Sequence, residues 1–192
     1  MQLNQKQKLL LQDLKSQEEV CIQKYTNYSS MANAGELKNL FNDLLNAEKT
    51  HYNTINDILS GKTPQINQSG TSTSSPLISK ANYSTIELKN KDEFLCKDAL
   101  SMEKHVSSVY DTSIFEMADS SVRNALNHIQ KEEQQHGEKI FQYMSCNSMC
   151  CQWFSRHFGD FDQSVLLFLV YDCILKKQKY VDIVHDLCYY YF

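Results

Sequence analysis

The sequence predicts an all-α fold, a bundle of four helices with one long crossover between the second and the third helix. The 192 residues include only five Gly and two Pro, the residues that most strongly interrupt helices. Four segments, each of roughly 25 residues, repeat apolar side chains at alternating steps of three and four, the core-facing stripe of a bundle helix. Two of the three connections between these segments are short, and one is long.

The apolar stripes define the four predicted helices. They cover residues 5–31, 36–59, 92–118 and 120–145. In the first of them, Leu11, Leu14, Cys21 and Tyr25 fall on one helix face. At 1.5 Å per residue each helix is roughly 37 Å long. Helices of matched length suit a bundle.

The connections indicate which kind of bundle is formed. Asn33-Ala34-Gly35 joins the first two helices, and we expect the glycine to take the left-handed conformation that ends many helices. Asp119-Ser120-Ser121 joins the last two and offers helix-capping side chains. Residues 60–91 form a long linker rich in Ser and Thr. Two tight hairpins joined by one crossover are typical of the ferritin-like bundle, which we predict for residues 1–148.

Composition and charge exclude several functional classes. There are 19 Lys and Arg against 23 Asp and Glu, a net charge of −4, and no basic tract. No nucleic-acid partner is therefore expected. The longest apolar run, residues 165–171, is far shorter than the roughly 20 residues of a membrane span. The chain opens without an apolar leader, so we expect synthesis inside the cell without a signal peptide.

The last part of the chain, residues 149–192, differs in composition from the rest. From residue 150 onward it holds many of the aromatic residues but contains no Asn, Glu, Ala, Thr, Met or Pro. This change indicates either a separate appended segment or translation outside the proper reading frame, and no function is assigned to it.

The seven cysteines do not form a zinc-finger pattern, because no Cys-x-x-Cys pair is present. We expect Cys21 and Cys96 to be small buried thiols on helices. Residues 146–151 contain three further cysteines. They are expected to be reduced thiols at a frayed helix end, with cross-linking or binding of a soft metal as the alternative.

Polar side chains interrupt every apolar stripe near the middle of its helix. They are Glu18 in the first helix, Glu48 and His51 in the second, Glu103 in the third, and Glu133 and His136 in the fourth. Unpaired carboxylates in a bundle core are unfavourable and repel one another. A pair of divalent metal ions removes both problems. Because the midpoints of antiparallel helices meet at one level, we expect the four glutamates to converge.

The spacing of these residues specifies the kind of metal site. Glu48-Lys49-Thr50-His51 and Glu133-Gln134-Gln135-His136 both have the form Glu-x-x-His, which places both side chains on one helix face. One Glu from each of two helices plus Glu-x-x-His from each of the other two is the di-iron or di-manganese carboxylate pattern. The sequence therefore predicts two Fe or Mn ions. A single Glu-x-x-His is usually a solvated helix face, and this interpretation competes with the metal site.

Other titratable residues near the stripes are expected to serve no metal. Glu19 and Glu132 lie beside the core-facing positions, and His105 and His128 lie off the stripe, so surface positions are expected for all four. Tyr25 and Tyr110, two turns from the single glutamates, are interpreted as core residues with satisfied hydroxyls. A redox role for these tyrosines is the alternative.

Three stretches also resemble a known family, the spore coat protein F (CotF-like) family of clostridia. They are residues 15–25 (KSQEEVCIQKY), 110–116 (YDTSIFE) and 127–137 (NHIQKEEQQHG), and the resemblance extends over about residues 5–148. The family is similar to ferritin-like proteins in fold and is associated with the coat of bacterial endospores. The resemblance implies a spore coat location, with other coat proteins or copies of the same chain as partners.

Two functions follow as hypotheses. The first is a structural protein of the spore coat that carries a di-metal carboxylate site. The second is an oxidoreductase similar to rubrerythrins or manganese catalases that protects against peroxide, with peroxide or O₂ as its small-molecule oxidant. Rubrerythrins usually carry a Cys-x-x-Cys iron domain, which this chain lacks, so catalase-like dismutation is favoured over reductant-driven peroxidase activity. Iron storage is a third interpretation. No catalytic residue is assigned.

Overall fold

The structure, a computed structural model, describes residues 2–64 and 79–149. In this part of the chain it contains four helices and no strand: α1 (Gln5–Met31), α2 (Gly35–Leu59), α3 (Ile86–Glu116) and α4 (Ser120–Cys146). The predicted all-α class is thereby confirmed for the described residues. Residues 65–78 of the Ser- and Thr-rich linker and residues 150–192 of the aromatic tail, with Cys150, Cys151, Cys173 and Cys188, lie outside the described residues.

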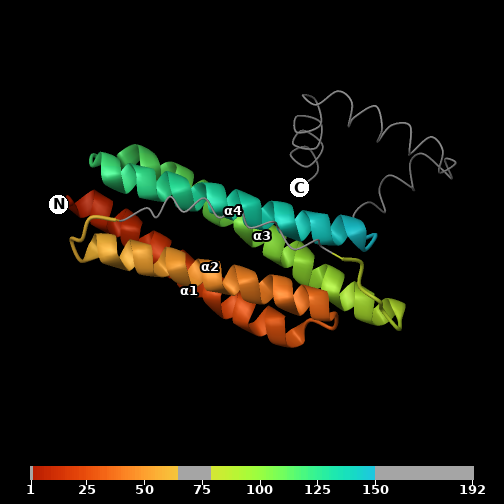
Figure 1. Cartoon of the computed structure of the whole chain (residues 1–192). Coiled ribbons are helices and arrows are strands. Elements are labelled where there is room, and N and C mark those ends of the chain that lie inside the picture. Colours follow the sequence, from red (N-terminus) through yellow and green to blue (C-terminus); the bar gives the residue numbers. More distant parts are fainter. Residues whose placement is uncertain (1, 65–78, 150–192) are drawn as a thin grey trace, which may run out of the picture. The chain divides into compact units, whose positions relative to one another are not determined.

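The four helices lie side by side as two helical hairpins (Figure 1). α1 packs most extensively on α2 and α3 on α4, with smaller contacts between α1 and α3 and between α2 and α4. α2 ends at the end of the bundle where the chain begins, whereas α3 starts at the opposite end (Figure 1). α2 and α3 therefore run in the same direction, and the chain between them must return along the length of the bundle.

Three of the predicted helices agree with the structure to within one residue at each end, but the third does not. α3 begins at Ile86, six residues before the predicted start. Its first turn has no buried stripe, since Ile86 is 69% exposed. A capping side chain, Thr85, which accepts a hydrogen bond from the Leu88 N–H, fixes the start instead. The linker between α2 and α3 is correspondingly shorter than predicted.

The connection between α1 and α2 is held by a side chain from α3. Asp92 is fully buried and accepts hydrogen bonds from the backbone N–H groups of Asn33 and Ala34 and from the Asn33 side-chain amide. Tyr83 donates a further hydrogen bond to the same carboxylate. The expectation for Gly35 was wrong: it starts α2, and the described glycine with a left-handed φ, 86°, is Gly61 after α2.

The apolar stripes form one core along the axis of the bundle. Leu11, Leu14, Phe41, Leu126 and Ile140 are among the fully buried side chains. No helix in the described residues is both long enough and apolar enough to cross a bilayer. The core is interrupted at mid-length by a layer of buried polar side chains, which is the candidate site.

Candidate metal centre

The layer of buried polar side chains at the middle of the bundle contains all six residues singled out from the sequence. They are Glu18 of α1, Glu48 and His51 of α2, Glu103 of α3, and Glu133 and His136 of α4. None is more than 3% exposed. Each helix contributes at its midpoint because the apolar stripe that faces the core passes through these positions. The expected convergence of the four glutamates is confirmed.

The six residues form two overlapping groups of four. One group contains Glu18, Glu48, His51 and Glu133, and the other contains Glu48, Glu103, Glu133 and His136. In each group the candidate ligand atoms all lie within 4.8 Å of one another. With metal–ligand bonds of about 2.0–2.3 Å, two ligands of one ion lie at most about 4.6 Å apart. Glu48 and Glu133 belong to both groups, as carboxylates that bridge two ions would.

Most of the side-chain polar atoms in this layer are buried without a hydrogen bond. Eight buried side-chain nitrogen and oxygen atoms lack a partner in the described residues, and all eight belong to these six side chains. Burying a polar atom without a partner costs about 1–3 kcal/mol in proteins. Eight such atoms in one layer are strongly unfavourable for a purely structural core. They are the donor atoms, carboxylate oxygen and imidazole nitrogen, that iron and manganese bind.

The two histidines turn the same ring nitrogen toward the carboxylates. Nδ1 of His51 lies 2.9 Å from Glu133 Oε1 and 3.3 Å from Glu48 Oε2. Nδ1 of His136 lies 3.0 Å from Glu48 Oε1 and 3.5 Å from Glu103 Oε2. The rings are stacked, with centroids 5.6 Å apart and planes inclined by 16°. The bundle therefore directs one imidazole nitrogen into each group of four.

Three glutamates of the layer, Glu18, Glu48 and Glu133, have shifted pKa values, and the shifts differ in sign. Burial raises the pKa of Glu18 and of Glu133 well above the ordinary 4.5. Burial acts in the same direction on Glu48, but its contacts with His136 and His51 outweigh burial and hold the pKa of Glu48 well below 4.5. The two glutamates shared by both groups, Glu48 and Glu133, thus have pKa shifts of opposite sign.

The histidines of the layer retain protons more strongly than free histidine. Burial acts to lower the pKa of His51, but contacts with Glu132, Glu133 and Glu48 outweigh it and raise the pKa well above 6.5. For His136, contacts with Glu103 and Glu48 outweigh burial in the same way. A cation that enters the layer must displace these protons, because only neutral imidazole and ionised carboxylate bind metals.

Two buried tyrosines hold the single glutamates across the bundle. The Tyr25 hydroxyl of α1 donates a hydrogen bond to Glu103 of α3, and the Tyr110 hydroxyl of α3 donates to Glu18 of α1. Both rings are fully buried. The expectation of core tyrosines with satisfied hydroxyls is therefore confirmed, and their partners are the glutamates that each belong to one group only.

The site residues of the two hairpins are related by one constant spacing. Glu18 and Glu103, Tyr25 and Tyr110, Glu48 and Glu133, and His51 and His136 form four pairs, and the residue numbers of each pair differ by 85. The α1–α2 hairpin and the α3–α4 hairpin thus repeat one pattern. Comparing the sequence with itself at this offset would have shown the repeat, which motif searching missed.

Glu132 occupies a different position from the one predicted. Its carboxylate Oε2 lies 3.0 Å from Nε2 of His51, and the side chain is 38% exposed. The contact with His51 outweighs burial and lowers the pKa of Glu132. The expected surface charge is therefore a direct contact of the site.

The remaining side chains of interest have the expected environments. Glu19, His105 and His128 are exposed, although His128 also lies 3.6 Å from Glu132. Cys21 is buried, as is Cys96, and Cys146 is exposed near the end of α4.

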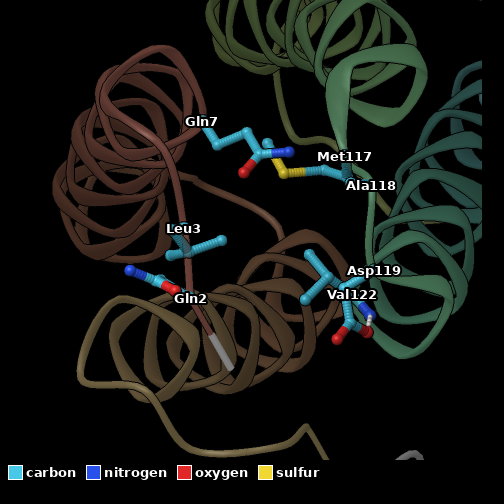
Figure 2. A pocket seen from close by; sticks show the side chains of 7 residues that line it. All are labelled: Gln2, Leu3, Gln7, Met117, Ala118, Asp119 and Val122. Carbon is cyan, nitrogen blue, oxygen red and sulfur yellow. Dashed lines mark hydrogen bonds between the residues drawn. The ribbon is translucent and has the colours of Figure 1, made fainter.

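A separate pocket lies where the start of α1 meets the α3–α4 connection, and none of its lining residues belongs to the polar layer (Figure 2). Its volume is about 290 Å³, and it is lined by Gln2, Leu3, Gln7, Met117, Ala118, Asp119 and Val122. Asp119 is engaged in capping α4, and the Gln7 side chain donates to the backbone carbonyl of Glu116. Asp119 and Gln7 are thus engaged in local structure, and the candidate site remains the buried layer.

The comparison with known proteins gives a family match for part of the chain. No curated protein and no solved structure matches it. A family model does: residues 91–152 match the Coat F domain. The matched segment contains Glu103, Glu133 and His136, half of the polar layer. The match supports a relationship to the CotF-like family and points to a spore coat protein.

Proposed function

We propose that this protein is a spore coat protein whose ferritin-like bundle holds two iron or manganese ions between its hairpins. The observation that carries the metal site is the set of eight buried atoms without a hydrogen bond, all on the six candidate ligands. The coat location is supported by the Coat F match over residues 91–152.

The residues fit the proposed ions in kind and in number. One position takes Glu18, Glu48, His51 and Glu133, and the other takes Glu48, Glu103, Glu133 and His136. Four carboxylates against two divalent ions give a neutral buried centre, which relieves the mutual repulsion of the glutamates. When bound, a pair of redox-active ions supplies electron exchange with peroxide or oxygen. Tyr25 and Tyr110 hold the carboxylates of Glu103 and Glu18 in place through their hydroxyls.

The metal site is tested by measuring metal content on the full chain, purified without chelator and reconstituted with Fe²⁺ or Mn²⁺. We expect about two ions per chain and a higher melting temperature, since a ligand that binds only the folded state stabilises it. Glu48→Gln removes a carboxylate shared by both positions and should abolish both effects. Glu19→Gln is the matched control, because it removes an exposed carboxylate next to Glu18.

The outcome that contradicts the metal site is a folded protein with almost no metal after reconstitution. The same holds if Glu48→Gln retains both ions. A protein that binds two ions is next tested for peroxide turnover, which separates a metal-stabilised structural protein from an oxidoreductase.

The coat location is tested separately by expressing a fluorescently tagged chain in a sporulating bacterium. We expect the label on the spore surface after release. A label that stays in the mother cell contradicts a coat role and leaves the metal site unaffected.

A further inference from the structure

The second ring nitrogen of each site histidine has a different environment in the two hairpins. Nε2 of His51 lies 3.0 Å from the Glu132 carboxylate. Because a carboxylate only accepts hydrogen bonds, the ring nitrogen donates. The proton is then on Nε2, and the lone pair of a neutral His51 is on Nδ1, which faces Glu133 at 2.9 Å.

His136 has no corresponding carboxylate in the described part of the chain. Its contacts with acidic groups there, Glu48 and Glu103, are made through Nδ1. The reason lies in the sequence. The counterpart of Glu132, 85 residues earlier, is Ala47, which carries no polar group. Positions 47 and 132 are both half-buried. The two hairpins therefore have equivalent positions here, but only one of these positions carries a carboxylate.

The other ligands of the two positions are equivalent. Each position takes one single glutamate, the same two shared glutamates and one histidine. Each single glutamate accepts a hydrogen bond from a buried tyrosine of the opposite hairpin. The described difference next to the ligands is therefore the carboxylate behind His51.

We propose that the two metal positions are unequal, and that Glu132 is a positioning residue that makes the His51 position the tighter one. This inference rests on the proposed metal site and deepens it. A carboxylate behind a histidine fixes the ring and its tautomer and strengthens the nitrogen as a ligand. Loss of such a partner typically weakens metal binding 10–100-fold. The first ion therefore enters the His51 position, and the His136 position fills only at higher metal concentration.

The inequality is tested by titrating the metal-free full chain with Mn²⁺ alone, followed by calorimetry. Two steps are expected, with dissociation constants that differ by about 10–100-fold. At one equivalent of Mn²⁺, electron paramagnetic resonance should show an isolated ion in nearly every chain, whereas equal positions would give a mixture of singly and doubly loaded chains.

Three variants assign the difference to Glu132. Glu132→Ala should weaken the tight step about 10–100-fold and leave the weak step in place, so that the two steps merge. Ala47→Glu supplies the missing carboxylate in the other hairpin and should tighten the weak step. Glu19→Ala removes a carboxylate that neighbours Glu18 without contacting a histidine in the described residues, and should change neither step.

The possible results separate this inference from the proposed function. If the unaltered chain binds neither Mn²⁺ nor Fe²⁺, the proposed metal site falls and the inference with it; a chain that binds Fe²⁺ alone is titrated with Fe²⁺ in the same way. If two ions bind with equal affinity, or if Glu132→Ala weakens both steps alike, the metal site stands and the inference is overturned. Circular dichroism of each metal-free variant checks its fold. Ala47→Glu provides an independent result should Glu132→Ala fail to fold.

Discussion

The two hairpins place the same side chains at the same heights but anchor their connections differently. Four site pairs recur at a spacing of 85 residues. The α3–α4 connection carries its own cap, since Asp119 accepts hydrogen bonds from the N–H groups of Ser121 and Val122. The α1–α2 connection has no side-chain cap of its own at Ala34 and relies on Asp92 of the other hairpin. The candidate ligands are thus placed symmetrically, whereas the hairpin that lacks a cap depends on the other hairpin for its loop.

The largest expected effect on stability follows from that dependence. Asp92→Ala removes the acceptor of four hydrogen bonds, from Asn33, Ala34 and Tyr83. We expect a loss of about 3–5 kcal/mol in the free energy of unfolding, measured by urea denaturation. Gln7, the counterpart of Asp92 at a spacing of 85, donates to the Glu116 carbonyl and belongs to the cap of α1. Gln7→Ala should cost about 1–2 kcal/mol.

Equal losses from the two variants, or a small loss for Asp92→Ala, would contradict the dependence of the first connection on the second hairpin.

Tyr25 and Tyr110 test whether the two hairpins support their glutamates equally. Tyr25→Phe and Tyr110→Phe each leave one oxygen of a buried glutamate without its donor. Each should destabilise the metal-free protein by about 1–2 kcal/mol in urea denaturation, and the two losses should be similar. Tyr28→Phe is the control, because Tyr28 donates to the half-exposed Asp98 and should cost less. A large difference between Tyr25→Phe and Tyr110→Phe would show that the two hairpins do not support the centre equally.

A smaller effect on stability is expected from a change of pH, because side chains of the metal-free layer bind protons more strongly than they do in the unfolded chain. His51 and His136 have pKa values raised above 6.5, so above that pH the folded state binds more protons than the unfolded state. Stability then falls as pH rises. Glu18 and Glu133 act with the same sign from pH 4.5 upward. Glu48 has the opposite sign, but only below 4.5.

We therefore expect the melting temperature of the metal-free protein to fall by about 5 °C or more between pH 6.5 and 9. The loaded protein should lose less, because bound metal has already displaced these protons. His136→Asn should reduce the slope of the metal-free curve. A melting temperature that rises over this range would contradict the pKa shifts of the histidines.

The sequence predicted most of the helices and the six candidate ligands, but it did not predict the start of α3 or the roles of two further carboxylates. Three helices followed from their buried stripes, but the first turn of α3 did not, since Ile86 is exposed and leaves no stripe there. The six site residues were predictable because a buried charge at mid-helix interrupts an apolar pattern. Glu132 was not, because its role depends on the direction of one side chain toward His51 of another helix. Asp92 did fall on the stripe of α3, and this buried carboxylate was a signal that went unused.

The spacing of 85 residues has a consequence for the origin of the chain. A protein of half this length, consisting of one hairpin, would supply one single glutamate, one tyrosine and one Glu-x-x-His. Two copies would assemble the whole centre as a twofold dimer. In such an ancestor every substitution appears on both sides of the axis. Joining the copies into one chain would remove that constraint, so that a carboxylate can stand at Glu132 while the equivalent position holds Ala47. In a fused chain of this kind, the two positions of the proposed metal site are free to differ.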